Sequence, residues 1–242
     1  MAVNTEHAVD VLAVGAHPDD VELGCGGLLH KLAQAGKRVG ILDLTRGEMG
    51  TRGTPEERAM EADAAAAILG VARRVNAGLP DGGVANSPEQ RLAVVVLLRQ
   101  FRPKFLLTLM APDRHPDHAA AHALVADANY LAGLARIDTG RFPHRAQHLL
   151  FFHPYTDHAG MPAFVADISA NFEVKLAALR AHASQFHNPG YPGQETFISS
   201  KGFWDGIEVR ARYWGNRIGV VYGEPFHADG PMPLDCLSVL GT

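Results

Sequence analysis

The segment Asp-Val-Leu-Ala-Val-Gly-Ala-His-Pro-Asp-Asp occupies residues 10–20. Its apolar part, residues 11–14, has the length and the β-branched content of a buried strand. His17, Asp19 and Asp20 follow this strand at once. Ionisable groups at the end of a buried strand need partners, because unpaired buried charge is costly or shifts its pKa. Taken alone, Pro-Asp-Asp predicts a turn in which Asp20 caps the next helix.

A second segment, residues 105–118, repeats this arrangement. Its apolar residues 105–109 predict another buried strand, and His-Pro-Asp-His follows at residues 115–118. Open α/β sheets place their ligand sites outside the carboxyl ends of the strands, so we expect the two segments to meet. Neutral imidazoles with one carboxylate and an open position form a catalytic zinc site. Together the two segments predict a metal site at one edge of the sheet.

The spacing of these residues leaves the ligand set open. His17 and Asp20 lie three residues apart, and either His115 or His118 can complete the set from the second segment. Two imidazoles and one carboxylate leave net positive charge and an open position on a divalent ion. Such an ion acidifies water and polarises an amide carbonyl, which is the chemistry of metal-dependent amide hydrolysis.

The sequence resembles the PIG-L/LmbE family of zinc-dependent de-N-acetylases. The resemblance lies in Ala-His-Pro-Asp-Asp at residues 16–20, in His-Pro-Asp-His at 115–118, and in residues 45–54, 184–186 and 195–200. Within the family the chain is most similar to the bacillithiol-biosynthesis deacetylases, which act on N-acetylglucosaminyl-malate. The resemblance therefore implies a hydrolase that removes acetyl from the 2-amino group of a glucosaminide, with N-acetylglucosaminyl-malate as the expected substrate.

The resemblance also implies a role for each residue of the two motifs. His17, Asp20 and His118 are the expected ligands of one Zn²⁺ per chain, so the family pattern decides for His118 over His115. Asp19 is the expected general base, since it is adjacent to a ligand and can face the attacking water. The alternative for Asp19 is a carboxylate that caps the following helix.

His115 is expected to stabilise the tetrahedral oxyanion or to donate a proton to the leaving amine. Asp117 is expected to hold His115 in the required tautomer. Family members often supply a tyrosine from the C-terminal region to the oxyanion, but the comparable position here holds Phe203, which cannot donate. Tyr191 is a candidate substitute, and a packing role in its loop is the alternative.

Three arginines are candidates for binding the carboxylates of malate, namely Arg52, Arg58 and Arg114. A planar guanidinium binds a carboxylate through two parallel hydrogen bonds. For each arginine, a solvated surface position is the alternative.

At 242 residues the chain fits one α/β domain over residues 1–242. Its formal charge of −4 indicates neither a nucleic-acid partner nor an acidic membrane surface. Cys25 and Cys236 are the only cysteines, which excludes a disulfide framework and a Cys-based zinc finger. We expect a cytoplasmic protein without a membrane span, since no secretory signal and no apolar run of ~18 residues is visible. From the resemblance we expect a homo-oligomer, with a hexamer as one form, that acts on a small N-acetylated sugar.

Strand-like and helix-like segments alternate, which predicts a Rossmann-like α/β domain with a mainly parallel sheet flanked by helices. Strands are expected at residues 11–14, 39–44, 74–77, 104–109, 149–152 and 218–221. Helices are expected to end near Gly36, to span residues 55–69, to follow the capping signal at 87–90, and to span residues 118–134 and 172–182. Residues 188–206 are rich in Pro, Gly and aromatic side chains and are expected to form a functional loop.

Three alternatives to this function remain open, one with another substrate and two with another activity. Free N-acetylglucosamine or a chitin oligomer is the alternative substrate for the same reaction. A metal phosphoesterase would use similar ligands but usually needs a second metal ~3.5–4 Å away. A non-catalytic sugar-binding relative is expected to have lost the residue at position 19, and Asp19 is present.

Overall fold

Five parallel strands form the central sheet, in the order β3-β2-β1-β4-β5. The structure is a computed structural model that describes residues 7–154 and 160–233. The strands are β1 (Val11–Gly15), β2 (Val39–Thr45), β3 (Arg73–Leu79), β4 (Phe105–Leu109) and β5 (His148–Phe152). The predicted α/β fold with a mainly parallel sheet is therefore confirmed.

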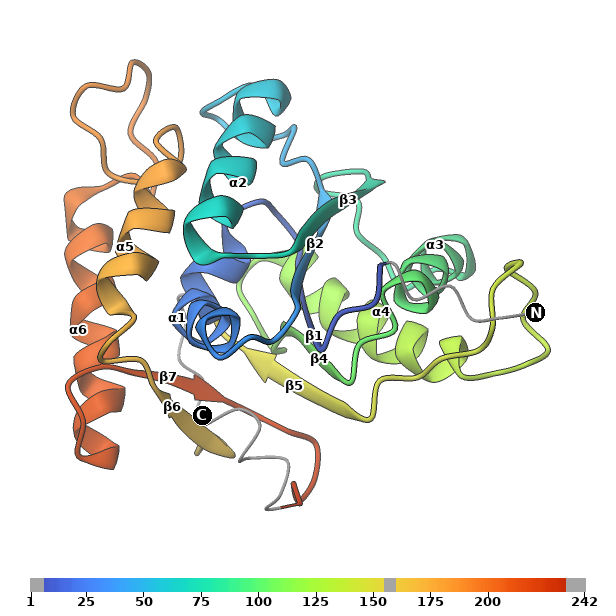
Figure 1. Cartoon of the computed structure of the whole chain (residues 1–242). Coiled ribbons are helices and arrows are strands. Elements are labelled where there is room, and N and C mark those ends of the chain that lie inside the picture. Colours follow the sequence, from blue (N-terminus) through green and yellow to red (C-terminus); the bar gives the residue numbers. More distant parts are fainter. Residues whose placement is uncertain (1–6, 155–159, 234–242) are drawn as a thin grey trace.

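Helices cover both faces of this sheet (Figure 1). On one side lie α1 (Asp20–Gln34) and α2 (Pro55–Leu69), and beyond them lie α5 (Phe172–Ala181) and α6 (Lys201–Ile218). On the other side lie α3 (Pro88–Phe101) and α4 (Pro116–Ala132). None of the helices in the described ranges is long and apolar enough to cross a membrane.

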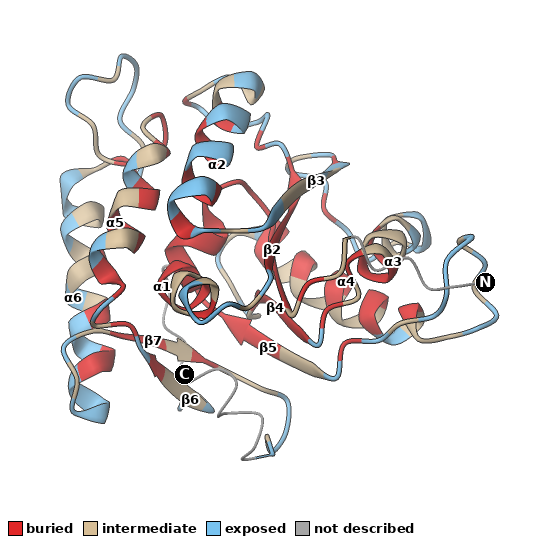
Figure 2. Ribbon diagram, in the orientation of Figure 1, coloured by how far each residue is buried: buried red, intermediate tan, exposed pale blue. Residues whose placement is uncertain are grey.

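The middle of the sheet is buried on both faces, as Figure 2 shows for β1, β2 and β4. Continuous apolar sequences such as Val-Leu-Ala-Val at residues 11–14 are typical of parallel strands covered by helices on both sides. The strand order reverses at β1, because β2 pairs with one of its edges and β4 with the other. Ligands of open α/β sheets bind at such a switch point, so the loops that follow β1 and β4 lie where a site is expected.

One predicted strand in the C-terminal third is wrong, and another strand there was not predicted. The expected strand at residues 218–221 is not formed, because α6 extends to Ile218 and Gly219 ends it in a left-handed conformation with φ of 78°. The strand there is β7 (Gly223–Phe226), which pairs antiparallel with β6 (Phe164–Asp167), a strand the sequence pattern did not predict.

The end of the expected loop also differs. Residues 201–206 belong to α6, whose start is capped by the Ser200 hydroxyl accepting from Phe203 N–H. Cys25 is buried, as a small apolar residue would be, whereas Cys236 lies outside the described residues.

Candidate active site

The loops after β1 and β4 place Asp20 between two imidazoles. Asp20 Oδ2 lies 3.4 Å from His17 Nδ1, and Asp20 Oδ1 lies 3.1 Å from His118 Nε2. All three side chains are buried. Burial opposes ionisation of Asp20, but His118 and His17 outweigh it and hold the pKa of this carboxyl well below its usual range. Two imidazoles and an ionised carboxylate that converge in this way fit one divalent metal ion.

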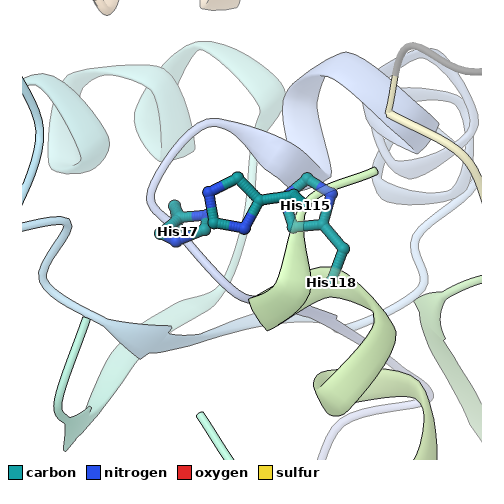
Figure 3. Close-up of side chains that lie close together, drawn as sticks. All are labelled: His17, His115 and His118. Atoms are coloured by element: carbon teal, nitrogen blue, oxygen red, sulfur yellow. The ribbon is translucent and has the colours of Figure 1, made fainter. Parts of the chain in front are cut away.

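His115 belongs to the same cluster. Figure 3 shows its ring beside those of His17 and His118 at the start of α4. Ligand-type nitrogens of the three histidines lie within 4.8 Å of one another, and the ring centroids of His115 and His118 are 4.7 Å apart. His118 is buried and contacts Asp20, whereas His115 is only partly buried. This difference favours His118 as the metal ligand and leaves His115 closer to solvent.

Two aspartates approach the other nitrogen of His17. Asp81 Oδ1 lies 3.0 Å and Asp117 Oδ2 lies 3.4 Å from His17 Nε2. Their carboxylates also accept backbone N–H bonds, from Met49 to Asp81 and from Gly82 and Val84 to Asp117. Carboxylates that hold the second ring nitrogen of a metal-binding histidine fix its tautomer and orientation.

Asp81 was not identified from the sequence. It follows β3 in Asp-Gly-Gly, which by itself indicates only a turn. The signal that could have found it is its place after the carboxyl end of a third parallel strand, next to the two motif-bearing strands. His17, Asp81 and Asp117 also form a group of possible metal ligands among the described residues.

Asp113 approaches the second ring nitrogen of His118, as Asp81 and Asp117 do for His17. Its Oδ1 lies 3.4 Å from His118 Nδ1 and accepts a hydrogen bond from the backbone N–H of His115. The contacts of Asp117 differ from the expected ones: its carboxylate faces His17, and its backbone N–H, rather than its side chain, bonds His115 Nδ1. The backbone therefore fixes the His115 ring.

Asp19 is the residue at the N-cap of α1, and its side chain makes no capping hydrogen bond. Its φ of 133° is rare for a residue with a side chain, and such strain persists only where the surroundings hold it. The carboxylate instead lies 3.3 Å from Arg58 Nη2. Burial raises the pKa of Asp19 to about 6, and the Arg58 guanidinium opposes a larger rise. The capping alternative is thus contradicted, and a carboxylate that titrates near neutrality suits a general base.

Arg58 is bound to the loops around the site. It is buried, and it donates hydrogen bonds to the carbonyl oxygens of Gly47 and Pro18 as well as to Asp19. These contacts place its guanidinium beside Asp19, and its expected contact with malate stays a prediction.

The other two predicted arginines stack on aromatic rings. The guanidinium carbon of Arg52 lies 4.6 Å from the ring centroid of Tyr191, whose hydroxyl donates to Glu57 on α2. Tyr191 is therefore engaged as a packing residue, the alternative left open above. Arg114 lies 4.0 Å from the ring centroid of Phe197 and lines the cavity described next.

A cavity of about 320 Å³ lies over the histidine cluster. All five segments that carry the family resemblance contribute to its lining, through His17, Asp19, Asp20, Met49, Gly50, His115, His118, Gln185, Phe186, Thr196, Phe197 and Ile198. A volume near 300 Å³ is at the small end of ligand cavities, which suits one sugar ring. Phe203 packs against two residues that line the cavity. The centroid of its ring lies 6.3 Å from that of Phe186 and 5.3 Å from that of Phe197.

Comparison with known proteins identifies similar chains. Residues 12–129 match the PIG-L family model, described as GlcNAc-PI de-N-acetylase. A diacetylchitobiose deacetylase of Thermococcus kodakarensis is 32% identical, over 88% of this chain and 80% of that protein. A 1D-myo-inositol 2-acetamido-2-deoxy-alpha-D-glucopyranoside deacetylase of Catenulispora acidiphila is 32% identical over 60% of each chain.

Among solved structures, the conserved protein TT1542 from Thermus thermophilus is similar. It is 44% identical with a TM-score of 0.84, and the match covers 93% of this chain and 96% of that one. The likeness therefore extends over nearly the whole fold.

Proposed function

Since this chain belongs to the PIG-L family of de-N-acetylases, we propose that it is a zinc-dependent hydrolase that removes acetyl from the 2-amino group of a glucosaminide. The observation that carries the proposal is the position of Asp20 between the imidazoles of His17 and His118, with Asp19 beside them. The alternative of a metal phosphoesterase is not supported by the family, whose named relatives are deacetylases.

His17, Asp20 and His118 would hold the zinc. When bound, the ion would acidify water and polarise the acetamide carbonyl. Asp19 would take the proton from the attacking water, and Arg58 keeps enough of this carboxyl ionised at neutral pH for it to do so. Arg58 thereby acts on the base.

His115 would act on the oxyanion. Because its Nδ1 accepts the N–H of Asp117, a neutral ring carries its proton on Nε2. Burial, His17 and His118 lower the pKa of His115, which favours the neutral form. A neutral imidazole can donate an Nε2–H hydrogen bond to the developing oxyanion while it keeps its proton, and the proton that Asp19 takes from the attacking water then goes to the leaving amine. This assigns to His115 the task that the family's tyrosine would perform.

The preferred substrate is N-acetylglucosaminyl-malate. Arg114 at the cavity mouth supports it, because a guanidinium can bind a carboxylate that projects beyond the sugar ring. The second candidate is N,N'-diacetylchitobiose or a short chitin oligomer, which the name of the Thermococcus relative supports. Assembly into a homo-oligomer and a cytoplasmic location stay predictions.

The test is acetate release by the zinc-loaded protein, followed by mass spectrometry. N-acetylglucosaminyl-malate, N,N'-diacetylchitobiose and N-acetylglucosamine would be compared at equal concentration, with the Asp19→Asn variant as the control for contaminating activity. We expect release from all three substrates to depend on Asp19, with the highest kcat/KM for the malate glycoside. No release above the Asp19→Asn control from any of them would contradict the proposal.

A further inference from the structure

Arg114 and Phe197 meet across the mouth of the cavity, although they are 83 residues apart in numbering (197 − 114). Arg114 comes from the loop between β4 and α4 and is exposed, and Phe197 comes from the C-terminal loop and is 57% exposed. The guanidinium carbon lies 4.0 Å from the centroid of the ring. An exposed arginine at this point of the fold is thus held against a flat apolar surface.

The ring itself has a fixed position. Thr196 and Ser199 exchange hydrogen bonds between backbone N–H and side-chain oxygen, and the Ser200 hydroxyl donates to the carbonyl of Phe197. These bonds close a tight turn around Phe197. Below it, Phe203 contacts the ring edge-to-face at 5.3 Å. The aromatic surface under Arg114 is therefore built into the loop.

Stacking has a specific consequence for an arginine. A free arginine side chain loses considerable rotamer freedom when it binds a ligand, and this loss weakens binding. Contact between the face of the guanidinium and an aromatic ring fixes the plane of the group, while the N–H bonds lie in that plane and point outward. A planar carboxylate is recognised in this plane, through two parallel hydrogen bonds.

We propose that Phe197 is a positioning residue that holds the Arg114 guanidinium at the cavity mouth, and that the pair forms a subsite for an anionic group on the aglycone, with a carboxylate as its ligand. This inference rests on the proposed function, since the cavity below the pair must hold the acetylated sugar. It adds a specificity residue, Phe197, that neither motif contains. One loop comes from the middle of the chain and the other from its C-terminal part, so the subsite exists only in the folded protein.

The test compares an anionic with a neutral substrate. kcat/KM would be measured for N-acetylglucosaminyl-malate and for methyl N-acetylglucosaminide on the zinc-loaded wild type, Arg114→Ala, Phe197→Ala and the double variant. We expect Arg114→Ala to lower the malate value about 10- to 150-fold, the cost of a lost hydrogen bond to a charged group. Phe197→Ala should lower it about 2- to 5-fold, as for an exposed cation–π contact. The double variant should be no worse than Arg114→Ala, because Phe197 acts through the arginine.

Two further variants sharpen this test. Phe197→Glu should pair with Arg114 and lower the malate value at least tenfold, whereas Phe197→Tyr keeps the ring and should restore it. Tyr130→Ala is the matched control. The guanidinium carbon of Arg145 lies 4.3 Å from the centroid of the Tyr130 ring, and neither residue lines the cavity. Tyr130→Ala should leave kcat/KM for both glycosides within twofold of wild type, whereas the Arg114 and Phe197 variants, apart from Phe197→Tyr, should lower kcat/KM for the malate glycoside by a larger factor than for the neutral glycoside.

The outcomes separate this inference from the proposed function. Equal losses on both glycosides in Phe197→Ala, or additive losses in the double variant, would overturn the positioning role while deacetylation stands. A wild type that shows no preference for the malate glycoside would overturn the anionic subsite in the same way. If no glycoside releases acetate, the proposed function fails, and calorimetric binding of the malate glycoside to wild type and Phe197→Glu then decides the subsite alone.

Discussion

The Arg58 guanidinium lies 3.3 Å from the Asp19 carboxylate, and both groups are buried at the start of α1. Burial raises the pKa of Asp19 to about 6, and the positive charge of Arg58 keeps it from rising further. A general base works only when deprotonated, so activity should fall as the pH drops through this pKa. We therefore expect Arg58 to lower the pH at which activity is lost.

Arg58→Met tests this dependence. Without the guanidinium the pKa of Asp19 should rise by about one unit or more, so the acid limb of the kcat/KM profile should move to higher pH by that amount. Activity should recover towards wild type in alkaline buffer. Arg46→Met is the control, since Arg46 pairs with Glu56 on the surface near the same loop. If the acid limb of the kcat/KM profile did not move in Arg58→Met, the group that titrates in this limb would not be Asp19.

The metal-ligand assignment predicts loss of zinc. His17→Ala, Asp20→Ala and His118→Ala should each reduce bound zinc sharply, because two remaining ligands cannot complete the site. Metal content after dialysis would be measured by mass spectrometry. His30→Ala is the matched control, since His30 bonds the carbonyl of Leu69 instead. Full zinc occupancy in any of the three variants would remove that residue from the ligand set.

Asp19→Asn separates the base from the ligands. The amide keeps the shape of the side chain but cannot accept the proton, so turnover should fall ~10²–10⁴-fold, the usual range for a positioned general base. Zinc content should stay at the wild-type level. Combined loss of zinc and activity would make Asp19 a ligand, and near-normal turnover would end its proposed role.

The sequence revealed the site where residue type and position together were informative. Histidine and aspartate directly after buried strands mark the sheet edge, so His17, Asp20 and His118 could be predicted before their distances were known. Asp81 could not, because Asp-Gly-Gly after a strand also describes an ordinary turn. Phe197 was missed because its role depends on Arg114, and local patterns do not report contacts between distant loops. The α6 helix was not predicted, and its first residues, Lys-Gly-Phe-Trp, follow a loop rich in Pro, Gly and aromatic residues.

Asp81 should support zinc binding without touching the ion. Its Oδ1 lies 3.0 Å from His17 Nε2, so Asp81→Asn should weaken zinc affinity about 10- to 100-fold, as for other partners of metal-binding histidines. Competition with a chromogenic chelator would measure this. Asp63→Asn, an exposed change on α2, serves as the control. Unchanged affinity in Asp81→Asn would leave Asp117 as the partner that fixes His17.

Glu224 on β7 stabilises the helix that carries Asp20. Within α1, Cys25 has non-helical φ and ψ of −145° and 15°, so the helix is interrupted there. Glu224 accepts the N–H groups of Gly27 and Leu28 just beyond the break, at 2.9 and 2.7 Å. Lys175 Nζ bonds both Glu224 and the carbonyl of Leu23 just before it. This buried pair satisfies the backbone groups that the interruption leaves open.

Glu224→Ala should therefore destabilise the fold well beyond a surface change. It leaves the Lys175 ammonium buried without its carboxylate and two N–H groups without acceptors, and removal of one partner of a buried ion pair costs about 3–5 kcal/mol. For a chain of this size, Tm should fall about 6–20 °C. Thermal unfolding followed by circular dichroism would measure the change.

Asp205→Ala, which breaks the exposed pair with Lys201, is the control and should leave Tm nearly unchanged. The change Lys175→Met combined with Glu224→Leu removes both charges and should recover part of the loss, because no unpaired charge then remains buried. A drop in Tm as small as that of the control would mean that water, and not Glu224, satisfies the interrupted helix.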